Sequence, residues 1–185
     1  MFIRLLDFCA AFFGLLLLWP LMLAVIVIGT LDTGSPIFVQ TRVGKNKKPF
    51  NLIKFRTMSV DTQSVASHLA SSTSITKLGA FLRKTKIDEL PQLINVLKGE
   101  MSLVGPRPNL FNQAELITER DALGIYDVLP GITGLAQVKN IDMSTPALLA
   151  KTDRLMIDTL TLAHYFRYII MTATGRGSGD AVGPK

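Results

Sequence analysis

The feature that most constrains the fold is an uncharged run of 24 residues at 8–31, built mainly from Leu, Ile, Val, Ala and Phe. As a straight helix rising about 1.5 Å per residue, it would reach ~36 Å, against a hydrocarbon core of ~30 Å. The run exceeds the ~7–15 apolar residues of a signal peptide, and no Ala-x-Ala-like site follows it. The sequence therefore predicts a retained membrane-inserted helix at 1–35.

Pro20 stands near the centre of this run, where it lacks the N–H that a helix interior needs, so we expect a kink or break near Trp19. Arg4 precedes the run, and six Lys or Arg residues follow within 42–56 with no acid among them. The basic bias of cytoplasmic flanks favours both ends in the cytoplasm and a re-entrant helix that turns back at Pro20. A straight, kinked span is the alternative, and the residues alone do not choose between the two.

The remaining residues suit one further domain, because 185 residues fit the size of a single domain. A composition of 48% hydrophobic and 18% charged residues excludes a disordered or low-complexity chain. Cys9 is the single cysteine, which excludes a disulfide framework and a cysteine zinc site. We expect a cytoplasmic domain at 36–173 and a flexible tail at 174–185.

The net charge of +6 is carried by the N-terminal half. Residues 1–98 hold 12 Lys or Arg against 5 Asp or Glu, whereas residues 99–185 hold 8 against 9. A polyanion is the expected partner of such a half: nucleic acid, anionic lipid headgroups or a phosphate-rich substrate.

The pattern after the membrane run predicts an α+β domain that is mostly helical. Two β-rich stretches, 37–42 and 50–55, flank a turn-rich basic connector and predict a β-hairpin. Ten of the twenty residues at 57–76 are Ser or Thr, which indicates a polar loop, and 130–138 is Gly-rich and irregular. Apolar spacing predicts helices at 78–84, 90–97, 110–123, 145–158 and 160–172.

The last predicted helix is amphipathic. Its apolar side chains fall on one face: Leu162, Tyr165, Phe166, Ile169 and Ile170. Such a helix either lies at a membrane interface or packs on the domain core, and the pattern fits both.

Asp88 and Glu89 are the candidate catalytic residues. Asp88 is the predicted N-cap of the helix that Gly99 ends, so both carboxylates would lie at its positive end. Arg83 and other cations precede the pair, and prolines on both sides of Arg107 would hold a guanidinium suited to phosphate. Carboxylates among cations predict a site for Mg²⁺ and a phosphorylated substrate.

These segments resemble a known family. The chain contains IFVQTRVGKNKKPFNLIKFRTM at 37–58, LRKTKIDELPQLINVLKGEMSLVGPRP at 82–108 and PGITGLAQV at 130–138. It resembles the bacterial sugar transferase family, and more narrowly the small monotopic phosphoglycosyl transferases. The resemblance covers about residues 3–140, with a looser C-terminal part.

The resemblance implies a Mg²⁺-dependent transfer of a phospho-sugar from a UDP-sugar to polyprenyl (undecaprenyl) phosphate, with release of UMP. By motif match, Asp88 would be the nucleophile of a ping-pong mechanism and Glu89 the second acidic member, both near the metal. Arg83 and Arg107 would hold phosphate oxygens, and Arg56 and Gln137 are further candidates for substrate binding. The domain at 36–173 would then be the catalytic domain.

The family also implies re-entry of the helix at Pro20. It implies a place on the cytoplasmic face of the bacterial inner membrane, in contact with the membrane lipid. The reaction would be the first step of glycoconjugate assembly. Three positions depart from the pattern of relatives. Trp19 replaces a serine before the membrane proline, Leu129 replaces an arginine before PGITG, and Lys139 begins a segment that replaces Asn-Gly-Arg. Neither the sugar nor a homodimer is decided by the sequence.

Two other readings of the sequence use fewer of its features. A non-catalytic membrane adaptor that binds anionic lipid through 42–56 needs only the basic hairpin and the apolar anchor, and it predicts that Asp88→Asn is silent. A nucleic-acid binder would explain the charge, but it leaves the apolar run unexplained and matches no recognition motif, so no nucleic-acid partner is expected.

Overall fold

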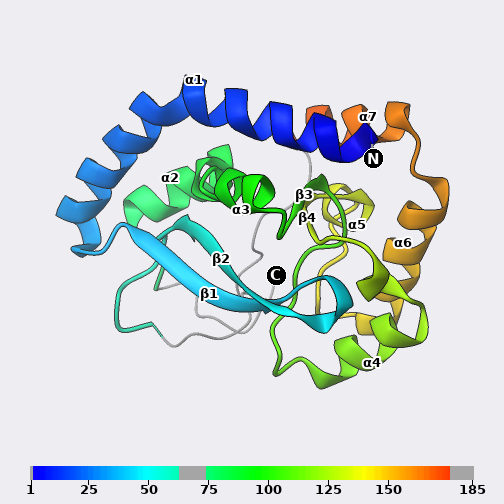
Figure 1. The fold of residues 1–185 in the computed structure, drawn as a ribbon. Coiled ribbons are helices and arrows are strands. Elements are labelled where there is room, and N and C mark those ends of the chain that lie inside the picture. The colour runs from blue at the N-terminus through cyan, green and yellow to red at the C-terminus, as the bar shows by residue number, and fades with distance from the viewer. Residues whose placement is uncertain (1, 63–73, 176–185) are drawn as a thin grey trace. The chain divides into compact units, whose positions relative to one another are not determined.

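The structure is a computed structural model that describes residues 2–62 and 74–175 (Figure 1). Helices dominate, with two small two-stranded sheets, so the predicted mostly helical α+β class is confirmed. The centre of the predicted polar loop and most of the predicted tail lie outside the described residues.

Helix α1 spans Phe2–Thr33 and is long and apolar enough to cross a membrane. It runs through Pro20 without a break, and Figure 1 shows it bowed over α2 (Lys77–Thr85) and α3 (Gln92–Lys98). An apolar helix can continue through a proline when it bends enough to relieve the clash between the proline ring and the carbonyl of the preceding turn. Of the kink or break predicted near Trp19, the break is absent, and re-entry stays a prediction.

One face of α1 packs on neighbouring elements. Val25 forms a core cluster with Phe55 of β2 (Pro49–Phe55) and Leu82 of α2. Near its start, Arg4 donates from Nη2 to the carbonyl oxygen of Val96 in α3. The opposite face is exposed and apolar, including Phe12, Phe13, Leu16, Leu17, Trp19, Leu23, Val27, Ile28 and Leu31.

The predicted hairpin is present as β1 (Ile37–Val43) and β2, joined by a 3₁₀ turn at Lys45–Lys47. Asn95 of α3 lies under it with 0% exposure. Its Oδ1 accepts from the amide of Ile53 at 3.1 Å, and its Nδ2 donates to the carbonyl of Asn51 at 2.8 Å. These two bonds fix α3 against β2.

The second part of the chain begins with β3 (Ser102–Val104), which pairs in parallel with β4 (Gly131–Thr133). Between them lie α4 (Ala114–Ala122) and a 3₁₀ turn at Ile125–Asp127. After β4 come α5 (Leu135–Val138), α6 (Pro146–Thr159) and α7 (Leu162–Ala173). Leu116 of α4, Ala136 of α5 and Leu149 of α6 form a shared core.

Two predictions for this part were wrong in detail. The Gly-rich stretch 130–138 is ordered as β4 and α5, because β4 is formed by pairing with a distant strand. Helix α4 begins later than expected, because Gln113 accepts the amide of Leu110 on its Oε1 at 2.9 Å and holds the preceding residues in a turn.

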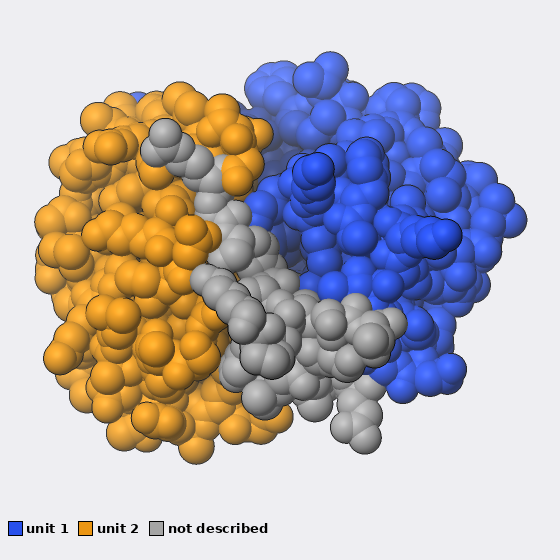
Figure 2. All heavy atoms as spheres, turned by 180° about the vertical axis from the view of Figure 1, so that it is seen from behind, with its two compact units in different colours: residues 1–40, 51–97, 179–185 blue, residues 41–50, 98–178 orange. Residues whose placement is uncertain are grey.

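The described chain divides into two compact units (Figure 2). Unit 1 contains α1, most of the hairpin, α2 and α3, within 1–40 and 51–97. Unit 2 contains the hairpin tip at 41–50 and the elements from β3 to α7.

Candidate active site

The acidic pair follows directly on α2 in unit 1. Lys86 ends α2 in the left-handed conformation, with φ 60° and ψ 13°, and a 3₁₀ turn at Ile87–Glu89 comes next. Asp88 therefore lies inside this turn, ahead of α3, and the prediction that it is the N-cap of that helix was wrong. The predicted helix end is confirmed, because Gly99 follows α3 with φ 85°.

Asp88 and Glu89 are both buried, with 3% and 6% exposure. Burial makes a carboxylate costly unless cations or donors surround it. Among the described residues, no group of three or more Asp, Glu, His or Cys side chains could hold a metal. A pair of carboxylates still suits Mg²⁺, which takes one or two carboxylates and completes its shell with substrate phosphate and water.

Arg83 lies in the last turn of α2, just before the acidic pair. Its Nε donates to Oγ1 of the buried Thr57 at 2.8 Å. Thr57 also sets the position of α2, because a Cβ on Gly79 would lie 2.0 Å from the Thr57 carbonyl oxygen. The end of β2 thus fixes the helix that carries Arg83, and unit 1 brings Arg83, Asp88 and Glu89 into consecutive elements.

Arg56 precedes Thr57, and its side chain donates hydrogen bonds to backbone carbonyls that follow the end of α1. Its Nε donates to the Ser35 carbonyl at 2.7 Å, its Nη2 donates to the Ile37 carbonyl at 3.3 Å, and its guanidinium lies 5.3 Å from the centre of the Phe38 ring. These contacts join α1 to the hairpin, so the structure gives Arg56 a structural role, and substrate binding by it stays a prediction.

In unit 2, the Gly-Pro-Arg-Pro segment packs backbone against backbone on Pro-Gly-Ile-Thr-Gly. The amide of Gly105 donates to the Thr133 carbonyl at 2.8 Å, and the amide of Gly131 donates to the Pro106 carbonyl at 2.9 Å. A Cβ on Gly131 would lie 2.0 Å from the nitrogen of Gly105. Only glycine permits this approach, which explains why both motifs contain it.

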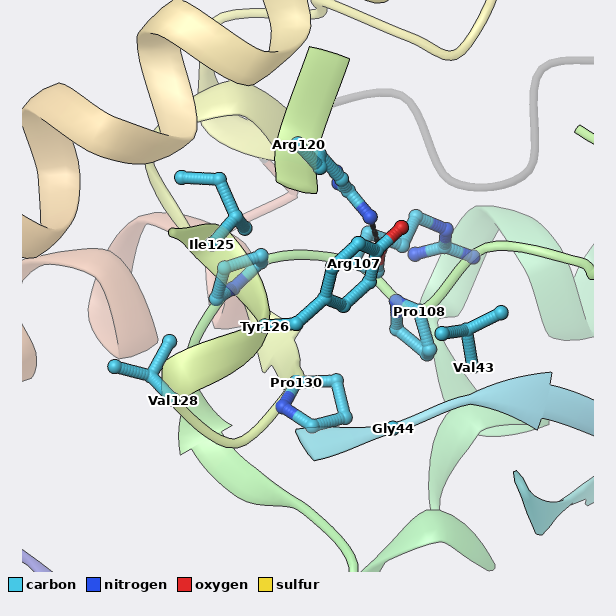
Figure 3. A pocket seen from close by; sticks show the side chains of 10 residues that line it. Val43, Gly44, Arg107, Pro108, Arg120, Ile125, Tyr126, Val128 and Pro130 are labelled. Atoms are coloured by element: carbon cyan, nitrogen blue, oxygen red, sulfur yellow. Dashed lines mark hydrogen bonds between the residues drawn. The ribbon is translucent and has the colours of Figure 1, made fainter. Parts of the chain in front are cut away.

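Arg107 lines a cleft in unit 2, shown in Figure 3. Pro106, Pro108 and Pro130 contribute apolar walls, and Tyr126 stands among them. In Figure 3 the hydroxyl of Tyr126 points toward Arg120, whereas the side chain of Arg107 extends away from the tyrosine ring.

Gln137 lies in the single turn of α5 in unit 2. Both its Oε1 and its Nε2 are buried, and neither has a hydrogen-bond partner within the part of the chain that the structure describes. An amide with unpaired donor and acceptor atoms suits a ligand that presents both. This observation favours the predicted binding role of Gln137.

A buried polar network in unit 2 was missed from the sequence. Arg120 and Asp153 form an ion pair at 2.7 Å with side-chain exposures of 2% and 0%. Asn109 accepts on Oδ1 from Arg120 Nη1 and from the Tyr126 hydroxyl, each at 3.0 Å. Burial raises the pKa of Asp153 against the opposing effect of Arg120, and it also raises the pKa of Tyr126. No sequence pattern predicts contact between Arg120 and Asp153, because they are 33 residues apart.

The amphipathic α7 packs on the domain core, and a place at a membrane interface stays a prediction. Tyr165 and Tyr168 are buried on the unit 2 core, while Leu162, Phe166 and Ile170 are exposed. The helix therefore packs on the core through its tyrosines and leaves an apolar strip on its other side.

Comparison with known proteins identifies the family of the chain. The bacterial sugar transferase family matches residues 1–176, which is nearly the whole chain. The chain belongs to this family. The resemblance found in the sequence is thereby confirmed.

Three relatives illustrate the similarity of this bacterial sugar transferase to curated proteins. The uncharacterized sugar transferase EpsL of Bacillus subtilis is 48% identical over 136 residues, covering 73% of this chain and 67% of EpsL. A putative undecaprenyl-phosphate N-acetylgalactosaminyl 1-phosphate transferase of the same organism is 40% identical, covering 70% of each chain. The UDP-glucose:undecaprenyl-phosphate glucose-1-phosphate transferase of Caulobacter vibrioides is 39% identical, covering 84% of this chain and 60% of that protein.

Proposed function

We propose that this chain transfers a phospho-sugar from a UDP-sugar to polyprenyl phosphate, and thereby starts the assembly of a bacterial glycoconjugate. The observation that carries the proposal is the buried Asp88–Glu89 pair, directly after the helix turn that bears Arg83. The relatives' names supply the reaction class, since they are transferases of sugar 1-phosphates to undecaprenyl phosphate. Those names differ in the sugar, so the sugar of this chain is left open.

In the first proposed step, a carboxylate oxygen of Asp88 attacks the β-phosphorus of the UDP-sugar. A bond forms between that oxygen and phosphorus, the bond from phosphorus to the bridging oxygen breaks, and UMP leaves with the bridging oxygen. The product is an aspartyl phosphosugar, and no proton transfer is needed. Arg83 lies just before the pair and supports this step, because a cation offsets the repulsion between an anionic nucleophile and a diphosphate.

In the second proposed step, a phosphate oxygen of polyprenyl phosphate attacks the same phosphorus. The aspartyl–phosphorus bond breaks, Asp88 regains its carboxylate, and polyprenyl-diphosphate-sugar is released. Two displacements at one phosphorus allow UMP to leave before the lipid reacts, which is the ping-pong order.

We further propose that Asp88 and Glu89 hold Mg²⁺. When bound, the metal would neutralise diphosphate charge and stabilise the leaving UMP. Arg107 would hold phosphate oxygens, and the buried amide of Gln137 would pair with a group that both donates and accepts.

We also propose a monotopic place on the cytoplasmic face of the inner membrane, and the packing of α1 supports the monotopic part of this proposal. Contacts with unit 1 run from Arg4 near the start of α1, through Gly14 beside Leu93, to Gly29 beside Pro36. A straight span would draw α2 and α3 into hydrocarbon together with α1, which is costly for their charged side chains. Insertion of the exposed apolar face from one side avoids this cost.

The test uses the full chain in detergent or nanodiscs with Mg²⁺, undecaprenyl phosphate and a panel of UDP-sugars, with UMP release as the readout. We expect release with at least one donor, loss on chelation with EDTA and recovery on adding Mg²⁺. Asp88→Asn should lower the rate by roughly 10³-fold or more. Asp158→Asn, at an exposed acid of α6, is the matched control and should keep the wild-type rate.

The adaptor reading of the sequence predicts the opposite pattern. No UMP from any donor with folded protein and lipid present would contradict the proposed reaction. Full activity of Asp88→Asn would contradict the proposed nucleophile and leave the reaction class intact.

A further inference from the structure

The segment 106–108 is held at each of its backbone carbonyls. The first accepts a backbone amide of β4, and the second, that of Arg107, accepts Nη1 of Arg120 at 2.8 Å. The third, that of Pro108, accepts Nη1 of Arg42 at 3.2 Å. Proline also fixes its own φ and restricts the residue before it. The backbone under Arg107 therefore has little freedom.

One buried side chain joins this segment to two helices. Arg120, at the end of α4, donates from Nη1 to the Arg107 carbonyl and to Oδ1 of Asn109, and from Nη2 to Asp153 of α6. The Tyr126 hydroxyl donates to the same Asn109 oxygen. The Arg120 guanidinium thus binds the backbone of Arg107, the side chain of Asn109 and Asp153 of α6.

This arrangement carries a desolvation cost that an apolar core would not. Burying an arginine and an aspartate removes both charges from water, and apolar residues of similar volume often stabilise such a site as well or better. Nε of Arg120 and Oδ1 of Asp153 lack hydrogen-bond partners among the described residues. Helix α6 also carries an exposed pair, Arg154–Asp158, that has no such cost. The buried pair therefore calls for a reason other than stability.

We propose that the Arg120–Asp153 pair positions Arg107 for phosphate binding. Asp153 fixes the plane of the Arg120 guanidinium, Arg120 holds the Arg107 carbonyl, and the side chain of Arg107 extends away from the Tyr126 ring (Figure 3). Arg120 and Asp153 are positioning residues that act through Arg107. This inference rests on the proposed function, in which Arg107 binds phosphate oxygens of the donor.

The principal test is the double variant Arg120→Met/Asp153→Leu, which removes both charges and keeps most of the buried volume. Its thermal unfolding midpoint should stay close to that of the wild type. Its KM for the UDP-sugar should rise about ten-fold, with a smaller change in kcat, because a misplaced guanidinium weakens donor binding. The matched control is Arg154→Met/Asp158→Leu, at the exposed pair of the same helix, and it should keep both constants.

A double-mutant cycle separates positioning from general disturbance. Arg107→Ala should raise KM in the wild-type background, but it should add little in the Arg120→Met/Asp153→Leu background, because the same interaction is already lost. The positioning role would be overturned if Arg107→Ala raised KM by the same factor in both backgrounds. A wild-type KM in the Arg120→Met/Asp153→Leu variant would also overturn it. No effect of Arg107→Ala in the wild type would instead overturn the proposed phosphate role of Arg107 itself.

Tyr126→Phe keeps the proposal testable if the double variant does not fold. It removes one hydroxyl, leaves the ion pair in place and should raise KM by roughly three-fold. An unchanged KM in Tyr126→Phe would contradict a positioning role that extends from the Tyr126 hydroxyl and Asn109 Oδ1 through Arg120 Nη1 to the Arg107 carbonyl.

Discussion

Gly131 lies against Gly105 so closely that a Cβ on Gly131 would stand 2.0 Å from the Gly105 nitrogen. This contact joins β3 to β4, and with them the Gly-Pro-Arg-Pro and Pro-Gly-Ile-Thr-Gly segments. The Pro-Arg-Pro segment follows Gly105 directly, so the glycine contact fixes the position of the backbone that leads to Arg107.

Gly131→Ala should therefore destabilise the protein by at least about 2 kcal/mol, because backbone on both sides has no room to move. Gly34 is the matched control, since its φ is +72° and nothing lies near its Cβ position. Gly34→Ala should cost only about 1 kcal/mol, from backbone strain alone. Chemical unfolding in detergent measures both, and equal losses would argue against a contact-driven effect at Gly131.

Thr57→Val should reduce turnover more than it reduces stability. Valine keeps the shape of threonine but cannot accept the 2.8 Å hydrogen bond from Arg83 Nε, whose loss costs about 1 kcal/mol. Arg83 would then lose its fixed place beside the acidic turn. Thr57→Ser retains the hydroxyl and should keep most of the activity, so equal rates for the two variants would exclude this role of the hydroxyl.

Alkaline pH should weaken the fold through Tyr126. Burial raises the pKa of this phenol above its ordinary value of 10.0, so between the two pKa values the native protein keeps a proton that the unfolded chain has released. The stability supplied by the phenol is fully present below pH 10 and is lost as the pH rises through the native pKa. Unfolding midpoints measured from pH 8 to 11 should fall more steeply for the wild type than for Tyr126→Phe, and parallel curves would refute the shift.

The membrane arrangement of α1 can be tested with the single cysteine. Cys9 is exposed, so Cys9→Ser gives a cysteine-free chain into which Phe2→Cys is introduced. A re-entrant α1 places this cysteine on the cytoplasmic side, where an impermeant maleimide should label it in inverted vesicles and not in intact spheroplasts. Ser59→Cys serves as the control for the domain side, and opposite accessibility of the two cysteines would establish a span.

Local patterns were sufficient for much of the fold. Helical spacing and Gly99 predicted α3, and the basic turn between β-rich stretches predicted the hairpin. Asp88 departs from this pattern because Lys86 adopts a left-handed conformation and starts a separate 3₁₀ turn. A single lysine with positive φ has no sequence signature of the kind that glycine or asparagine provides.

The rest of the fold depends on contacts between distant residues. Strands β3 and β4 have three residues each, and neither is recognisable before the other is placed beside it. The same holds for Arg120 and Asp153, which are ordinary helix residues until α4 and α6 pack together. Helix α7 shows a related effect, because its periodicity revealed an apolar face but not that Tyr165 would be buried and Phe166 exposed.

The most direct measurement of the central claim is isotope exchange without a lipid acceptor. Wild-type protein is incubated with Mg²⁺, an accepted UDP-sugar and labelled UMP, and the label in UDP-sugar is followed. Covalent transfer to Asp88 predicts exchange in the wild type and none in Asp88→Asn. Absence of exchange in a preparation that turns over normally with undecaprenyl phosphate would contradict the aspartyl intermediate.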